Sequence, residues 1–100
     1  MSMTKTLREL LENIPHTILQ GSEDIAVSGV AFDTRKIKGG EVFVCIAGTK
    51  VDGHSYIPQA SENGAAAVIV TRSDIDVPEG VTAVKVNDDR KALALLGAAW

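Results

Sequence analysis

The first hydrophobic pattern of the chain is helical. Four apolar residues recur at helical spacing near the N-terminus: Leu7, Leu10, Leu11 and Ile14. At the start of this pattern, Thr6 and Glu9 have the spacing of a capping box, in which each side chain bonds the backbone N–H of the other residue. The pattern therefore predicts a short amphipathic helix that ends near Pro15.

Strand patterns follow this helix. Ile25 and Val27 alternate with polar or small residues, which predicts a strand running towards Phe32. The run Val42 to Ile46 is apolar without interruption and mostly β-branched. Such a run is typical of a strand that is covered on both faces of its sheet.

The middle of the chain has the pattern of a strand–helix–strand unit. Pro58 suits the first turn of a helix that runs to about Asn63, and Gly64 suits the position after its end. Residues 66–71 are predicted to form a second buried strand. A strand, a helix and a strand over about 30 residues predict a right-handed unit with two parallel strands.

A further strand is predicted over 81–86, and Asn87 is predicted to cap a final helix that begins near Asp88. Apolar residues still recur when the sequence stops: Leu93, Leu96, Ala99 and Trp100. We therefore expect a longer parent chain and a partly exposed Trp100. Together the elements predict one α/β domain, with a small, largely parallel or mixed sheet flanked by helices on both sides.

Composition restricts the class of protein. The chain has 100 residues, 45% of them hydrophobic and only 4% aromatic, which fits one globular domain with an aliphatic core. A net charge of −3 argues against a nucleic-acid partner. The longest apolar run, 65–70, is too short to cross a bilayer, and the charged N-terminus is unlike a signal peptide. Cys45 is the only cysteine, so we expect no internal disulfide and a cytoplasmic location.

No catalytic or metal-binding set is recognisable. The sequence lacks a G-x-x-x-x-G-K-[ST] phosphate loop, a G-x-G-x-x-G motif, an H-E-x-x-H motif and a cysteine cluster. We interpret 39–40 as a turn and 52–54 as a Gly-centred turn into a helix, in preference to an acid–base pair or metal ligands. Cys45 is predicted to be a small core residue, and His16 a loop residue.

The loops around the run 42–46 are better candidates for a ligand site. Four cations lie between positions 33 and 50: Arg35, Lys36, Lys38 and Lys50. Thr34 and Thr49 add hydroxyl donors, and Gly48 and Gly53 permit close backbone approach. This set suits a diphosphate attached to a flat polar ring. A solvated basic rim without a ligand explains the same residues equally well.

With these residues in view, the whole chain resembles the N-terminal domain of the Mur ligases. The likeness is carried by five segments, which read VAFDTRKI from Val30, GEVFVCIAG from Gly40, VDGH from Val51, IPQA from Ile57 and NGAAAV from Asn63. Within that family, the chain is most similar to the ligases that add the third residue of the peptidoglycan stem peptide.

The resemblance implies that residues 1–100 form a single domain that binds the UDP end of UDP-N-acetylmuramoyl-L-alanyl-D-glutamate. Carried over position by position, the UDP contacts fall on Phe32, Thr34, Thr49, Lys50 and Val51. In the parent enzyme, ATP and Mg²⁺ belong to a central domain and the amino acid to a C-terminal one. This chain would then hold no catalytic residue, no metal and no cofactor, and it would be inactive alone. We expect a monomer that binds neither nucleic acid nor membrane.

Alternatives remain at this stage. The ligases that add the terminal dipeptide share the D-[ST]-R and D-G-H patterns. A non-catalytic α/β module that binds a nucleotide or a protein is possible, and a receiver-type domain is less well supported because only Asp33 is suitably placed. The sequence does not distinguish meso-diaminopimelate from L-lysine as the added residue.

Overall fold

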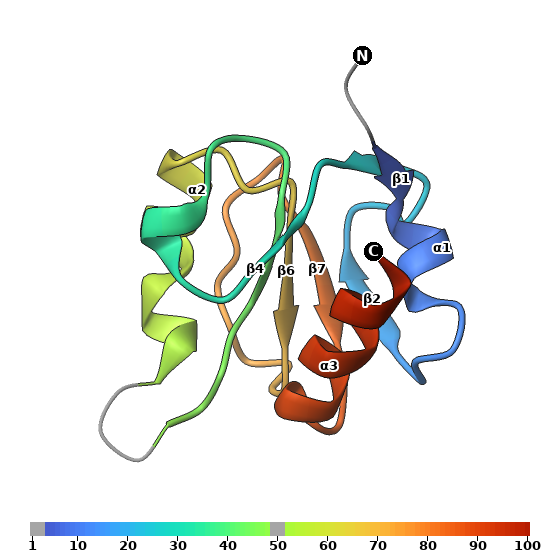
Figure 1. Cartoon of the computed structure of the whole chain (residues 1–100). Helices are drawn as coiled ribbons and strands as arrows, with labels where there is room; N and C mark the ends of the chain where they lie inside the picture. Colours follow the sequence, from blue (N-terminus) through green and yellow to red (C-terminus); the bar gives the residue numbers. More distant parts are fainter. Residues whose placement is uncertain (1–3, 49–51) are drawn as a thin grey trace.

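Strands and short helices follow one another along the chain in a computed structural model that describes residues 4–48 and 52–100 (Figure 1). In chain order the elements are β1 (Lys5–Thr6), α1 (Leu7–Leu11), β2 (Thr17–Gln20), β3 (Ala26–Val27), β4 (Val30–Ala31), the 3-10 helix η1 (Thr34–Lys36), β5 (Val42–Val44), the 3-10 helix η2 (Gly53–Tyr56), α2 (Ile57–Glu62), β6 (Ala67–Val70), β7 (Thr82–Lys85) and α3 (Asp89–Ala99).

Five strands form the main sheet in the order β2-β7-β6-β5-β4. The four strands from β4 to β7 are parallel to one another, and β2 runs antiparallel to β7. The pairing of β2 is interrupted by an irregularity between Ile18 and Gln20. β1 and β3 form a separate two-stranded ribbon. The predicted small mixed sheet of an α/β domain is confirmed.

Side chains alternate between two cores on opposite faces of this sheet. Along β5, Val42 and Val44 belong to the core that α1 and α3 cover, whereas Phe43 belongs to the core that α2 covers. Residues 67–70 of β6 alternate in the same way and are all buried. Because both faces of the central strands are covered, their sequences are continuously apolar. Figure 1 shows α2 on one side of the sheet and α1 with α3 on the other.

The predicted strand from Ile25 towards Phe32 is wrong in extent, because the structure divides it into two. β3 pairs with β1, and β4 pairs with β5 in the other sheet. Between them, Ser28 turns its polar groups to another loop: its backbone N–H donates to the Gly40 carbonyl at 2.9 Å, and its hydroxyl donates to the Gly39 carbonyl at 2.8 Å. These bonds separate β3 from β4.

The helix ends agree with the sequence in most respects. The capping box of Thr6 and Glu9 is present, but α1 ends at Leu11, before the predicted end near Pro15. α2 carries its proline in the first turn, and Gly64 follows its C-cap with φ at 97°. The predicted cap of the last helix is displaced by one residue, because the Asp88 carboxylate, and not Asn87, accepts the Lys91 N–H.

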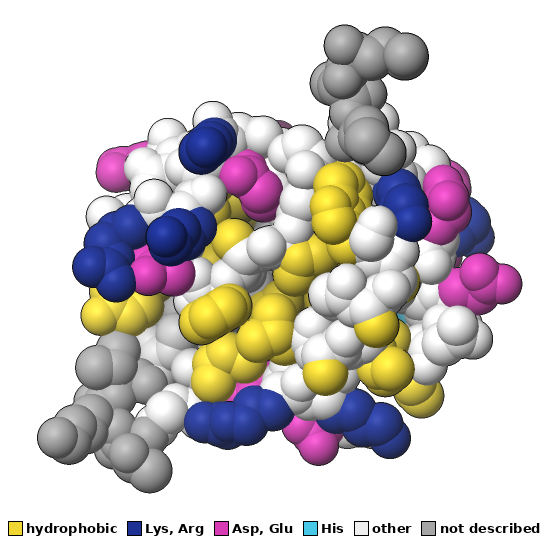
Figure 2. Space-filling model, viewed as in Figure 1, with side chains coloured by type: hydrophobic (Ala, Val, Ile, Leu, Met, Phe, Trp, Pro, Cys, Tyr) yellow, Lys and Arg dark blue, Asp and Glu magenta, His cyan; other side chains and the backbone are white. Residues whose placement is uncertain are grey.

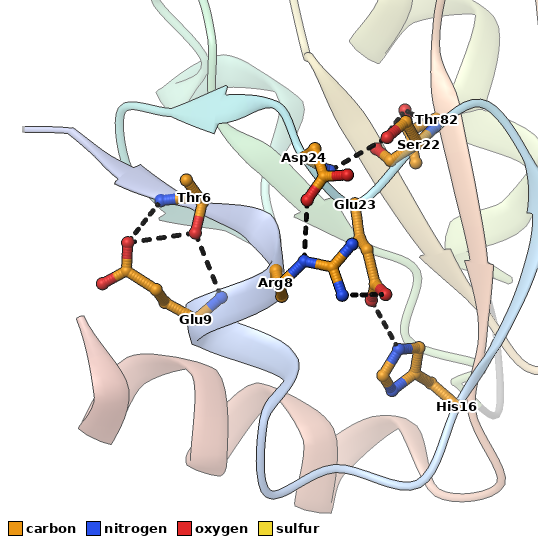
Figure 3. A network of polar contacts seen from close by, with 8 residues as sticks. All are labelled: Thr6, Arg8, Glu9, His16, Ser22, Glu23, Asp24 and Thr82. Atoms are coloured by element: carbon orange, nitrogen blue, oxygen red, sulfur yellow. Dashed lines mark hydrogen bonds and ion pairs between the residues drawn. The ribbon is translucent and has the colours of Figure 1, made fainter.

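A polar network fastens α1 to the loop before β3 (Figure 3). Arg8 contacts Glu23 at 3.2 Å and Asp24 at 2.7 Å. His16 is a loop residue as predicted, and the structure adds a partner that the sequence did not suggest: its Nε2 lies 2.9 Å from Glu23, while its Nδ1 donates to the Ile14 carbonyl.

The surface combines apolar and charged areas. Figure 2 shows apolar side chains across the middle of one face, with lysines and arginines at its margins. Trp100 is 39% exposed, as expected, whereas Cys45 is fully buried, as predicted. Among the described residues, none of the helices has both the length and the apolar character needed to cross a membrane.

Candidate functional site

A groove of about 460 Å³ opens beyond the carboxyl ends of β4 and β5. It lies between the segment that follows β4 and the segment formed by η2 and α2. Its lining residues are Phe32, Asp33, Thr34, Arg35, Phe43, Ile46, Gly53, Tyr56 and Gln59. In open α/β sheets, ligands bind in crevices outside the carboxyl ends of the strands. The groove is therefore the candidate binding site.

Two of the five UDP contacts predicted from the sequence lie in this groove. Phe32 directly follows β4 and is 64% exposed, so its ring offers a flat apolar wall. Thr34 is the first residue of η1 and is 8% exposed. Its carbonyl accepts a hydrogen bond from the Asn63 side chain at 2.9 Å, which ties η1 to the end of α2. The other three predicted contacts, Thr49, Lys50 and Val51, lie outside the described residues.

Asp33 and Arg35 form an ion pair with each other at the start of η1. The Asp33 carboxylate caps the turn by accepting the Arg35 backbone N–H at 2.9 Å, and it also meets the Arg35 guanidinium, with Nη2 2.8 Å from Oδ2. The side-chain hydrogen bond from Arg35 is the main cause that lowers the pKa of Asp33 to about 2. The charge of Arg35, one of the four cations noted in the sequence, is thus neutralised within the motif.

Gly53 has a role within the fold that the sequence did not suggest. A Cβ atom at this position would lie 2.6 Å from the backbone N of Ile46, so the absence of a side chain lets these two backbone segments come together. The Gly53 N–H donates to the Ile46 carbonyl at 2.8 Å. The two residues together make one wall of the groove.

Tyr56 and Gln59 are groove residues that the sequence analysis missed. Tyr56 ends η2 and is 41% exposed, and Gln59 lies three residues further along, in α2. The available signal was this spacing, which places both side chains on the same side of a helical segment. Phe32 and Tyr56 supply two exposed rings, and the Gln59 carboxamide supplies a donor and an acceptor.

The groups that line the groove are suited to binding a ligand through ring stacking and hydrogen bonds. Two exposed rings and a carboxamide in one groove suit an aromatic ring with polar edges, and the hydroxyl of Thr34 suits an anionic oxygen. In the described ranges, no group of three or more His, Cys, Asp and Glu side chains is placed to hold a metal ion. The Cys45 thiol is buried, and burial is the main cause that raises its pKa to about 12.

Comparison with known protein families gives a match to a family model described as "Mur ligase family, catalytic domain", over residues 26–100. Similar proteins include UDP-N-acetylmuramoyl-L-alanyl-D-glutamate--2,6-diaminopimelate ligases. The one from Clostridium perfringens is 42% identical over 92% of this chain, and the one from Bacillus licheniformis is 41% identical over 100% of it. The chain spans 19% of the length of each.

Solved structures with a similar fold include MurF from Acinetobacter baumannii, with a TM-score of 0.78 and 24% identity over 97% of this chain and 21% of that one. At this identity, the likeness shows the fold alone. MurF ligase from Thermotoga maritima, solved in complex with ADP, has a TM-score of 0.55 and 30% identity over 67% of this chain and 15% of that one.

Proposed function

This chain belongs to the Mur ligase family, and from that membership we propose that it anchors the UDP moiety of UDP-N-acetylmuramoyl-L-alanyl-D-glutamate for an ATP-dependent ligase. The observation that carries the proposal is the groove beyond β4 and β5, which holds Phe32 and Thr34 at the positions implied by the family pattern. The similar ligases are named for 2,6-diaminopimelate, and we propose the same added residue here.

The groove supports a specific arrangement of the ligand. The uracil ring would lie against Phe32 and Tyr56, with the Gln59 carboxamide at its polar edge. The diphosphate would lie near the Thr34 hydroxyl. Thr49, Lys50 and Val51, from the segment after Gly48, are proposed as further contacts.

The sequence has no G-x-x-x-x-G-K-[ST] phosphate-binding loop. We therefore propose that ATP and Mg²⁺ are held by other parts of a longer ligase. There, the D-glutamyl carboxylate would attack the γ-phosphate of ATP with release of ADP, and the incoming amine would displace phosphate from the acyl phosphate. We propose that this domain takes part only by holding the substrate, and that the chain alone does not hydrolyse ATP.

We also propose that the domain works as a cytoplasmic monomer, bound neither to nucleic acid nor to a membrane. The net charge of −3 and the single buried cysteine support this proposal. The dipeptide-adding ligases remain the alternative within the family, supported mainly by likeness of fold.

A titration of the chain with UDP, followed by amide chemical shifts, tests the proposed function. We expect shifts centred on Phe32, Thr34, Gly53, Tyr56 and Gln59. ADP serves as the control, because it has the same diphosphate on a different base. An absence of response at millimolar UDP, or shifts confined to another face, would overturn the proposal.

Substitution of Thr34 tests the diphosphate contact. Thr34→Ala removes one hydroxyl donor and should weaken UDP binding by about 1 kcal/mol, which is roughly fivefold in Kd. Thr34→Ser keeps the hydroxyl and is the matched control, with an affinity close to that of the parent. Calorimetry or the same shift titration measures both. Equal affinities for the parent and Thr34→Ala would remove the hydroxyl from the site.

A further inference from the structure

A buried histidine lies directly behind the groove without lining it. His54 is the second residue of η2, between the groove residues Gly53 and Tyr56. Its side chain is only 2% exposed, so it cannot itself contact a ligand in the groove.

Both nitrogen atoms of the His54 ring are used, and their roles are fixed by their partners. Nε2 lies 3.1 Å from the backbone N of Thr71. A backbone amide only donates, so Nε2 carries no proton and accepts this bond. Nδ1 therefore carries the proton and donates to the Asp52 carboxylate. The surroundings select a single tautomer.

Through these bonds the turn 52–54 is attached to the carboxyl end of β6. Asp52 accepts the His54 backbone N–H at 3.0 Å and also contacts the Arg72 guanidinium at 3.1 Å. Hydrogen bonds from the backbone and the ring of His54 are the main causes that lower the pKa of Asp52. Thr71 and Arg72 immediately follow β6, so His54 and Asp52 together join the turn to that strand.

The same turn is attached to the end of β5. The Gly53 N–H bonds the Ile46 carbonyl at 2.8 Å, and Ala47 forms an isolated antiparallel bridge with Asp52. Ile46 and Gly53 are both groove residues. The contacts of His54 therefore connect the ends of two neighbouring parallel strands through the backbone that forms one wall of the groove.

We infer that His54 is a positioning residue for the UDP groove, which fixes the backbone of Gly53, and with it the position of Ile46 and Tyr56, by bridging Asp52 to Thr71. The inference rests on the proposed function, because it assigns a role in the same site. Since preformed walls reduce the ordering that a ligand must impose, loss of the bridge should weaken binding without removing any ligand contact.

Two substitutions each delete one of the two ring bonds. In His54→Gln the amide oxygen can still accept from Thr71, but Asp52 loses the donor that the ring Nδ1–H supplied. In His54→Asn the amide NH₂ can still donate to Asp52, but the Thr71 N–H loses its acceptor. We expect each variant to bind UDP about fivefold to tenfold more weakly, with changed amide shifts at Ile46, Gly53 and Tyr56 in the absence of UDP.

The chain offers a matched control in its other histidine. His16 also has both ring nitrogens in hydrogen bonds, to Ile14 and Glu23, and it does not line the groove. His16→Gln should therefore bind UDP as tightly as the parent. This comparison separates the position of His54 from a general loss of packing or hydrogen bonding.

Ring ¹⁵N shifts of the unaltered chain give a readout that does not depend on any variant folding. We expect His54 to show a protonated Nδ1 and an unprotonated Nε2. The opposite tautomer, or unchanged UDP affinity in both His54 variants beside a parent that binds, would overturn the positioning role alone. A parent that does not respond to UDP would overturn the proposed function and this inference together.

Discussion

The Asp33 side chain binds both the backbone and the side chain of Arg35. Its carboxylate caps η1 and holds the Arg35 guanidinium, so the Asp-Thr-Arg motif is a self-contained turn at the edge of the groove. All three residues of the motif line the groove, but Thr34, which lies between the two charged residues, takes no part in this ion pair. Because the Arg35 guanidinium is paired with the Asp33 carboxylate, the motif offers a ligand the Thr34 hydroxyl and a neutralised ion pair, and not an unpaired cation.

The low pKa of Asp33 predicts how its contribution to stability depends on pH. Its pKa is about 2 in the folded chain, against an ordinary value of 3.8. Because the folded-state value is depressed, the stabilisation is complete above about pH 4 and is lost as the pH falls towards 2. Asp33→Asn keeps a capping oxygen but loses the charge. It should therefore be less stable than the parent at pH 7, by an amount that shrinks between pH 4 and 2.

Urea unfolding at several pH values measures this difference. Arg35→Gln is the companion variant, since loss of the guanidinium should raise the pKa of Asp33 towards 3.8, as followed by its carboxyl ¹³C shift. A difference between Asp33→Asn and the parent that does not change across this range would contradict the assignment.

At the scale of elements, the two ends of the segment between β5 and η2 are held by different parts of the fold. Beside the contacts of Gly53 and Asp52, the Ala47 N–H donates to the Asp89 carboxylate at 2.8 Å. Asp89 is the first residue of α3 and is 9% exposed. The last helix therefore takes part in shaping the surroundings of the groove, although it lines none of it.

Two glycines in different elements should respond oppositely to alanine. Gly53→Ala places a Cβ 2.6 Å from the backbone N and 2.9 Å from the backbone O of Ile46, so the turn must move, and we expect a loss of about 1–3 kcal/mol in unfolding free energy. Gly97 lies within α3 and has no atom within 4 Å of an added Cβ, so Gly97→Ala should gain about 0.5–1 kcal/mol.

Denaturant unfolding of both variants against the parent measures these changes. UDP titration adds a second comparison: Gly53→Ala should also weaken binding, because it displaces a groove wall, whereas Gly97→Ala should leave the affinity unchanged. Equal stabilities for the parent and Gly53→Ala would show that the contact with Ile46 is looser than the structure indicates.

At the scale of the whole molecule, the two cores share one sheet. The core under α1 and α3 and the core under α2 use alternate residues of the same strands. Neither core can lose its packing while the other keeps an intact sheet. We therefore expect one cooperative unfolding transition for the described fold.

The chain contains one tryptophan and one tyrosine, which report on different parts of it. Trp100 follows α3, and Tyr56 lies at the start of α2. Thermal unfolding followed by Trp100 fluorescence, by Tyr56 absorbance and by far-UV circular dichroism should give one common midpoint. Separate midpoints for Trp100 and Tyr56 would show that the two faces unfold independently.

The sequence predicted the centre of this fold better than its edges. β5, α2 and β6 were predictable because strands buried on both faces leave long apolar runs and because Pro58 and Gly64 mark the helix ends. β2 leaves no apolar run in the sequence, because its residues are alternately exposed and half-buried. Its partner β7 also lies more than 60 residues away along the chain. The shift from Asn87 to Asp88 arose because both residue types cap helices well.

The site was predictable to a similar degree. Phe32 and Thr34 could be proposed because they follow a predicted strand and match a family pattern. The spacing of Tyr56 and Gln59 indicates only that they share one side of a helical segment, since their place in the groove depends on how η2 and α2 pack beside the end of β4. Periodicity within one segment contains no information about that packing.

The two outer strands of the sheet also bear on self-association. An exposed strand edge can pair with the edge of another molecule and so begin aggregation. Here β4 offers only two residues at one edge, and the pairing of β2 at the other is broken between Ile18 and Gln20. A short edge and an irregular one are both poor templates for a neighbouring strand, so each outer strand offers little backbone for a second copy to pair with.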